Sequence, residues 1–285
     1  MQPEIPGAPQ RTRSAMTDLG PRIASALAMA AVALGLLYAG ALPFTALILL
    51  VALVMSWEWG NVVRGAGTDA VLAVHGIVVT AAVILAGLGY AALALITLIA
   101  GTFVVGALRF GEKARLSAVG VLYVGFPAVA LVVLRLGVEP YGFRAVLFVV
   151  LAVIATDTLA YFTGRGVGGP KLWPSVSPNK TWSGLIGGIT GAALVGAAFA
   201  YTTGSASVVR LALIGLALGL IAQGGDLAES SLKRSFGVKD ASSLLPGHGG
   251  LMDRMDGVVA AAVLALLIGL AINIREPARA LLLGY

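Results

Sequence analysis

Long apolar stretches separated by short polar segments run through almost the whole chain after residue 20. A helix needs about 20 mostly apolar residues to cross a bilayer. The pattern contains nine such windows, and because many of their residues are glycine or alanine, we expect the helices to pack closely. The nine predicted spans are residues 21–39, 41–57, 69–87, 89–108, 116–135, 144–163, 183–202, 207–225 and 257–274.

The composition supports an all-α, polytopic membrane bundle. The 285 residues are 59% hydrophobic and 11% charged, and the mean hydropathy is +0.96. A soluble domain averages about 25% charged residues, so this chain lacks the polar side chains that a soluble surface requires. The chain also contains no cysteine. Disulfides, thiolate metal ligands and cysteine nucleophiles are therefore excluded.

The basic residues predict the orientation of the bundle. With nine spans, fourteen of the 19 lysine and arginine residues fall on the side of the N-terminus and five on the other side. Because such residues collect in cytoplasmic loops, we expect a cytoplasmic N-terminus, and we attribute the net charge of +6 to these loops instead of to nucleic-acid binding. Residues 1–20 are predicted to be a disordered tail, 21–143 an N-terminal group of helices and 144–285 the catalytic region.

The longer of two polar cytoplasmic loops, residues 226–256, carries most of the candidate chemistry. Asp226 lies at the end of one predicted span, and Asp253 and Asp256 lie at the start of the next, so their carboxylates should converge. A hard cation such as Mg²⁺ would relieve their repulsion, with phosphates completing its coordination. Basic residues in the same loop suit phosphoryl or nucleotidyl transfer. The plainer alternative is a charged, solvated loop.

The other long loop, residues 164–182, follows an apolar span that contains Asp157. A carboxylate inside such a span is costly and indicates function, although a hydrogen bond between helices is the alternative. The stretch "SPNKTWSG" then places Ser177, Lys180 and Thr181 just before a predicted helix. Donors at a helix N-terminus favour anion binding, and an ordinary helix cap is the alternative.

One stretch, "SLKRSFGVKDASSLLPGHGGLMDRMD" at residues 231–256, resembles the signature of the phosphatidate cytidylyltransferases, also called CDP-diacylglycerol synthases. The upstream stretches "DTLAYFTGR" and "SPNKTWSG" resemble other shared parts of that family, so the resemblance covers residues 157–257. The matching signature residues are Ser231, Lys233, Arg234, Lys239, Asp240, His248, Gly249, Gly250, Asp253, Arg254 and Asp256.

This resemblance implies an enzyme that joins CTP and phosphatidic acid into CDP-diacylglycerol and pyrophosphate in phospholipid biosynthesis. It implies a cation-dependent site, for which we expect Mg²⁺ with a second cation as an option, and a homodimer. We expect the plasma (inner) membrane, with the active site facing the cytoplasm. The predicted metal ligands, which are also catalytic, are Asp226, Asp253 and Asp256. The other predicted catalytic residues are Lys233, Arg234 and Lys239. The predicted substrate-binding residues are Asp157, Ser177, Lys180, Thr181, Ser231, Asp240, His248, Gly249, Gly250 and Arg254.

Three alternatives stay open from the sequence. A CTP-dependent lipid kinase would transfer the γ-phosphate and release CDP. A CDP-alcohol phosphotransferase would carry an Asp-Gly-x-x-Ala-Arg motif, which this chain lacks. A transporter with Asp157 on its pathway would spread polar residues along several spans, whereas here they cluster at one face. The product therefore distinguishes these functions: a cytidylyltransferase releases pyrophosphate, a kinase releases CDP, and a transporter turns over no nucleotide.

Overall fold

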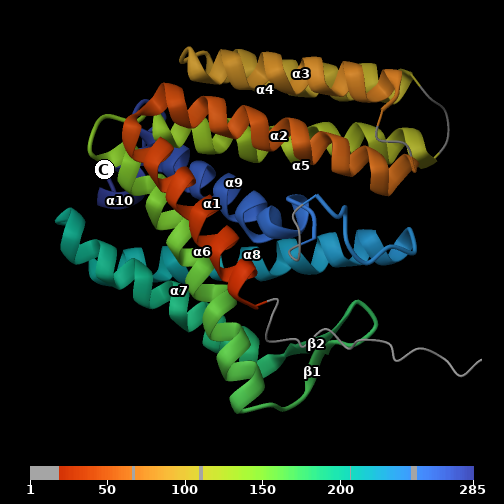
Figure 1. The fold of residues 1–285 in the computed structure, drawn as a ribbon. Coiled ribbons are helices and arrows are strands. Elements are labelled where there is room, and N and C mark those ends of the chain that lie inside the picture. Colours follow the sequence, from red (N-terminus) through yellow and green to blue (C-terminus); the bar gives the residue numbers. More distant parts are fainter. Residues whose placement is uncertain (1–18, 66–67, 109–111, 206, 245–248) are drawn as a thin grey trace, which may run out of the picture.

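A computed structural model of the chain describes residues 19–65, 68–108, 112–205, 207–244 and 249–285. In this part of the chain it contains ten helices and one two-stranded hairpin (Figure 1). In chain order the elements are α1 (Leu19–Ala39), α2 (Ala41–Arg64), α3 (Ala70–Gly87), α4 (Ala91–Ala107), α5 (Glu112–Arg135), α6 (Tyr141–Gly166), β1 (Lys171–Trp173), β2 (Ser177–Thr181), α7 (Trp182–Thr203), α8 (Val208–Ser235), α9 (Met252–Ile272) and α10 (Pro277–Leu283).

Seven helices within the described ranges, α2, α3 and α5–α9, are long and apolar enough to cross a membrane. Helix α4 and the apolar part of α1 are shorter, so the predicted count of nine full-length spans is not confirmed. Large apolar side chains such as Leu42 and Phe103 point outward, with 82% and 74% of their surface exposed. Such surfaces suit contact with lipid, and the protein is a multi-pass membrane protein.

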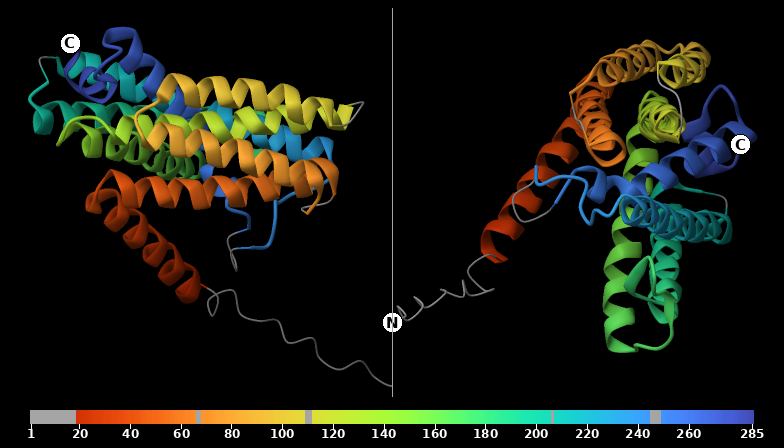
Figure 2. Two further views of the ribbon diagram at one scale, coloured as in Figure 1. Left: turned by 90° about the horizontal axis from the view of Figure 1, so that it is seen from above. Right: turned by 90° about the vertical axis from the view of Figure 1, so that its right-hand side faces the viewer.

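The helices form two packed groups. Helices α2–α5 lie against one another, and α6–α9 form the second group, in which α7 packs along both α6 and α8. The groups meet mainly where α5 packs on α9 (Figures 1 and 2). The C-terminal ends of α2 and α8 and the hairpin face the same end of the bundle (Figure 1). Loops from both groups can therefore meet at this end.

Glycines allow α6 and α7 to approach each other closely. A Cβ atom added at Gly184 would lie 2.9 Å from the carbonyl oxygen of Ala160, and one added at Gly188 would lie 2.8 Å from that of Thr156. Any larger residue would push the helices apart. This spacing is typical of membrane helices that associate through small residues. It holds the start of α7 beside the part of α6 that carries Asp157.

Two predicted features need correction. Helix α8 ends at Ser235 instead of near 225, and α9 begins at Met252 instead of near 257, so the connecting loop is only 236–251. Their polar ends stay helical because charged side chains on them pair with groups on neighbouring elements. The description as all-α also omits the antiparallel hairpin, in which Lys171 pairs with Thr181 and Trp173 with Ser177.

Candidate active site

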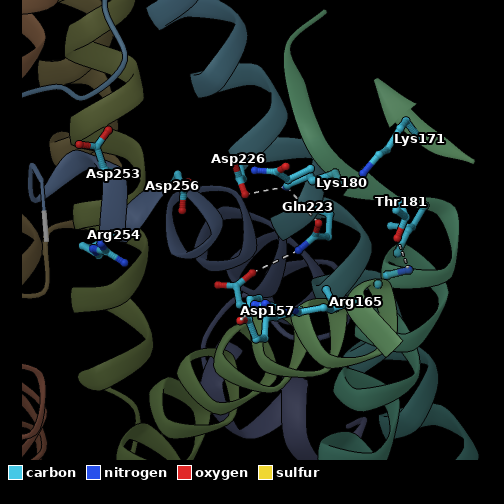
Figure 3. A pocket seen from close by; sticks show the side chains of 16 residues that line it. Asp157, Arg165, Lys171, Lys180, Thr181, Gln223, Asp226, Asp253, Arg254 and Asp256 are labelled. Atoms are coloured by element: carbon cyan, nitrogen blue, oxygen red, sulfur yellow. Dashed lines mark hydrogen bonds and ion pairs between the residues drawn. The ribbon is translucent and has the colours of Figure 1, made fainter. Parts of the chain in front are cut away.

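An open cavity of about 750 Å³ lies where α6, α8 and α9 meet the hairpin and the start of α7 (Figure 3). Residues distant in the sequence converge on it from all of these elements. The predicted site residues that line it are Asp157, Lys180, Thr181, Asp226, Asp253, Arg254 and Asp256. The two polar loops singled out in the sequence therefore contribute to one site.

Lys180 is the centre of a polar relay along one wall of this cavity. Its ammonium group lies 2.6 Å from Oδ2 of Asp226 and donates a hydrogen bond of 3.0 Å to Oε1 of Gln223. The amide nitrogen of Gln223 in turn donates to Oδ1 of Asp157 at 3.2 Å (Figure 3). Strand β2 supplies the lysine, α8 supplies Gln223 and Asp226, and α6 supplies Asp157. The relay thus connects three elements.

Asp256 reaches the same wall because α8 and α9 touch at a glycine. A Cβ atom added at Gly225 would lie 2.7 Å from the carbonyl oxygen of Asp256, so no side chain larger than hydrogen fits without a shift. The next residue, Asp226, then faces the cavity beside Asp256 (Figure 3). In the part of the chain that is described, the hydrogen bond to Asp256 comes from the backbone N–H of Gly257. Its carboxylate keeps capacity for a ligand.

Behind the cavity, Lys233 holds two carboxylates from different helices. Its ammonium group lies 2.9 Å from Oε1 of Glu229 and 2.5 Å from Oδ1 of Asp253. Glu229 is fully buried and accepts a hydrogen bond of 3.3 Å from the hydroxyl of Tyr123 on α5. Asp226 and Glu229, three residues apart on α8, therefore belong to different clusters. This cluster joins α8, α9 and α5.

Asp253 also organises the loop that precedes α9. Its Oδ2 accepts backbone hydrogen bonds from Gly250 at 2.8 Å and from Ala241 at 3.0 Å. With Lys233 on Oδ1, both carboxylate oxygens have donors, and Asp253 stands apart from Asp226 in Figure 3. Asp253 lines the cavity, and these contacts also hold the loop before α9 in place.

Glu58, from the N-terminal half of the chain, anchors the same loop from the other side. It is fully buried at the end of α2. Its Oε1 accepts hydrogen bonds from Ser242 Oγ at 2.6 Å and Leu251 N at 2.8 Å, and its Oε2 accepts one from Met252 N at 2.6 Å. A carboxylate at a helix N-terminus satisfies free N–H groups and is stabilised by the helix dipole. Glu58 therefore caps α9.

Comparisons with known proteins place this chain in a family. Residues 20–271 match the model of the Cytidylyltransferase family. The chain belongs to this family. A phosphatidate cytidylyltransferase of Brucella abortus is 39% identical over 256 residues, which is 89% of this chain and 94% of that protein. A phosphatidate cytidylyltransferase of Bacillus subtilis is 42% identical over 119 residues, which is 41% of this chain and 44% of that protein. One of Haemophilus influenzae is 41% identical over 140 residues, which is 45% of this chain and 49% of that protein.

In this family member, several predicted residues lie away from the cavity. Ser177 pairs with Trp173 at the turn end of the hairpin, and Arg234 is exposed at the end of α8. His248 lies outside the residues that the structure describes. The other predicted residues that do not line the cavity are Ser231, Lys233, Lys239, Asp240, Gly249 and Gly250, of which Lys233 and Gly250 contact Asp253 directly.

The cavity also contains residues that the sequence patterns did not indicate as site residues. Arg165 and Tyr161 from the end of α6, Lys171 from β1 and Gln223 from α8 all line it. Two of them belong to the stretch "DTLAYFTGR", which was noted only for its resemblance. Glu58 had no such signal, because a single acid at the end of a span is common and its partners lie more than 180 residues away in the sequence.

The carboxylates of the cavity are candidate ligands for a cation. Within the described residues, no three acidic or histidine side chains stand close enough together to form a ready-made metal site. Asp226 and Asp256 nevertheless line one wall of the cavity, and Asp157 lies beside them (Figure 3). Such oxygen donors fit a Mg²⁺ ion that takes its remaining ligands from phosphates. These carboxylate oxygens are therefore suitable Mg²⁺ ligands, although the described residues do not form a complete metal site by themselves.

Proposed function

We propose that this protein transfers the cytidylyl group of CTP to phosphatidic acid, giving CDP-diacylglycerol and pyrophosphate for phospholipid biosynthesis. One observation carries the proposal: the similarity to a phosphatidate cytidylyltransferase extends over 94% of that relative and 89% of this chain. The cavity adds the required chemistry, since it combines carboxylates and cations at the end of a membrane bundle. A membrane-bound lipid and a nucleotide from water can both reach such a place.

In the proposed reaction, a phosphate oxygen of phosphatidic acid attacks the α-phosphorus of CTP. A new O–P bond forms, and the bond from the α-phosphorus to the oxygen that bridges to the β-phosphate breaks. The bonding electron pair leaves with pyrophosphate. No covalent enzyme intermediate is required, because the lipid phosphate is itself the nucleophile, and the protein acts by positioning and electrostatic stabilisation.

Lys180 is placed for the electrostatic part of this role. Its side chain is 18% exposed and faces the cavity, where its ammonium group can exchange its contact with Asp226 for a phosphate oxygen. Asp226 and Asp256 are the proposed ligands of a divalent cation, with Asp157 beside them, and the role of Asp253 as a further ligand stays a prediction. When bound, such an ion neutralises charge on the phosphates and orients them.

The finer membrane assignments are part of the proposal. Nine crossings, with α1 and α4 as short spans, put the N-terminus, the hairpin and the loop 236–251 on one side. The excess of lysine and arginine on that side supports the cytoplasmic face. We also propose the plasma (inner) membrane and a homodimer, the latter testable from the mass of the purified protein in nanodiscs.

The test of the function is a product assay with purified protein, CTP, phosphatidic acid and Mg²⁺. We expect CDP-diacylglycerol and pyrophosphate in equal amounts, and no product when phosphatidic acid or Mg²⁺ is left out. Release of CDP with a phosphorylated lipid would instead establish a kinase. Absence of any nucleotide turnover in a folded protein would contradict the proposal. Asp256→Asn serves as the matched inactive variant, because it keeps the side-chain volume but removes the charge.

A further inference from the structure

Two cations at the hairpin end of the cavity have no ion-pair partner in the part of the chain that the structure describes. They are Arg165, at the end of α6, and Lys171, at the start of β1, and both line the cavity. By contrast, Lys180 in the same cavity is paired with Asp226, and Lys233 behind it is shared by Glu229 and Asp253. Arg165 and Lys171 are thus available to an anionic ligand.

The Arg165 side chain is held in place before any ligand binds. One guanidinium nitrogen donates a hydrogen bond of 2.6 Å to the hydroxyl of Tyr161, one turn earlier on α6. The guanidinium carbon also lies 5.8 Å from the centre of the Tyr161 ring. An arginine has five N–H donors in a planar fork, so this contact leaves donors for two phosphate oxygens. Holding the fork in advance lowers the entropy cost of binding.

The acidic residues of the cavity favour a separate cationic site for the phosphates. Four aspartates line the cavity, and a chain of three phosphates brought among them would be repelled. Asp226, Asp253 and Asp256 are carried by α8 and α9, and Asp157 by α6, whereas Arg165 and Lys171 lie toward the hairpin (Figure 3). Arg165 and Lys171 therefore lie apart from the carboxylates of α8 and α9, whereas Lys180 is paired with one of them.

The position of Arg165 and Lys171 indicates which of the two proposed substrates they would bind. The C-terminal end of α6, the hairpin and the N-terminal end of α7 project together from the rest of the bundle (Figures 1 and 2). A lipid phosphate is tied to acyl chains in the bilayer, whereas a nucleotide enters from water. An in-line transfer at the α-phosphorus also places the leaving group opposite the attacking lipid oxygen. The hairpin end is thus suited to the phosphates that leave.

We propose that Arg165 and Lys171 form the subsite that binds the β- and γ-phosphates of the nucleotide and releases them as pyrophosphate. This inference rests on the proposed function for the identity of the nucleotide. As the bond to the bridging oxygen breaks, negative charge grows on the β-phosphate. The two cations stabilise that charge, which affects both nucleotide binding and the chemical step.

The experiment measures pyrophosphate binding directly, by isothermal titration calorimetry of the purified protein with Mg²⁺ present. Arg165→Gln and Lys171→Gln remove each charge, and we expect each to weaken pyrophosphate binding at least 10-fold, about 1.4 kcal/mol. Arg115→Gln and Lys113→Gln on α5 are the matched controls, because they remove exposed cations that do not line the cavity. Both controls should bind pyrophosphate like the parent protein. Arg165→Lys should restore part of the affinity.

Kinetics provide the second readout. We expect the Gln variants to raise the KM for CTP and the inhibition constant of pyrophosphate while the KM for phosphatidic acid stays unchanged. An unchanged pyrophosphate affinity would overturn the subsite, and so would a change confined to the KM for phosphatidic acid, which would assign these cations to the lipid headgroup. If the protein binds pyrophosphate through Arg165 and Lys171 but forms no CDP-diacylglycerol, the subsite stands and the proposed function fails.

Discussion

The ammonium group of Lys180 lies 2.6 Å from the Asp226 carboxylate, although the two residues come from different polar loops of the sequence. Strand β2 delivers the lysine to the side of α8 that carries the aspartate. If both act on one bound phosphate chain, their substitutions should not be independent. Asp226→Asn should lower kcat at least ~100-fold, about 2.7 kcal/mol, whereas Lys180→Ala should mainly raise the KM for CTP.

A double-mutant cycle measures the coupling between these residues. The kcat/KM of Lys180→Ala, Asp226→Asn and the double variant should reveal a coupling of about 1 kcal/mol or more, because contacting residues are typically coupled by 0.5–3 kcal/mol. Losses that add to within about 0.3–0.5 kcal/mol would show that the two loops act at separate sites.

Gly225 and Gly224 form a matched pair for testing how α8 and α9 are held together. A Cβ atom at Gly225 would lie 2.7 Å from the carbonyl oxygen of Asp256, whereas one at Gly224 meets nothing within 4 Å. Gly225→Ala should therefore displace Asp256 from the cavity and reduce kcat at least ~10-fold. Gly224→Ala should keep the activity and raise the melting temperature slightly, because alanine favours helices by up to about 1 kcal/mol. Equal activity of both variants would contradict this account.

Lys233 and Arg234 are neighbours in the sequence but differ in their surroundings. Lys233 is 8% exposed and is paired with two carboxylates, while Arg234 is exposed. Removing one partner of a buried charge cluster typically costs about 3–5 kcal/mol. Lys233→Met should lower the melting temperature in detergent sharply, and Arg234→Met should change it little. A thermally stable Lys233→Met protein would show that Glu229 and Asp253 need no counter-ion.

Glu58 is expected to affect catalysis through the loop that it holds. Glu58→Gln leaves one acceptor oxygen for three donors, and each buried N–H without a partner costs about 1–3 kcal/mol. We expect kcat to fall at least ~10-fold and amide hydrogen exchange to rise at Leu251 and Met252. Ser242→Ala removes one of the three contacts and should have a smaller effect.

The control for Glu58 is Glu276→Gln, at the start of α10, where the carboxylate contacts Arg279 and is partly exposed. It should change neither the exchange rates nor kcat. If Glu58→Gln also left both readouts at the level of the parent, the cap would have no bearing on the site.

The membrane orientation can be tested because the chain has no native cysteine. Ser243 lies in the loop before α9, and Thr202 lies at the C-terminal end of α7, away from the hairpin. Both residues are exposed. A cysteine at 243 should react with a membrane-impermeant thiol reagent only from the cytoplasmic side. A cysteine at 202 should react only from the outside. Labelling of both from one side would contradict the proposed topology.

The hydropathy pattern was sufficient to predict the membrane bundle and the apolar part of every long helix, but not the polar ends of α2, α8 and α9. Apolar side chains must face lipid or one another, so the length and composition of each window determine the helix almost independently of its neighbours. The charged stretches likewise contained residues that meet in the structure, since Asp157, Lys180, Asp226 and Asp256 line one cavity.

The partners of these charges depend on the tertiary structure alone. Lys233 and Arg234 are chemically similar neighbours, but helical rotation directs only Lys233 between Glu229 and Asp253. The role of Glu58 required knowing that the end of α2 meets the start of α9. Spacing along the chain determines which side chains share a helix face. Contacts between distant segments instead depend on how helices pack, and close approach at a residue such as Gly225 decides which carboxylates meet.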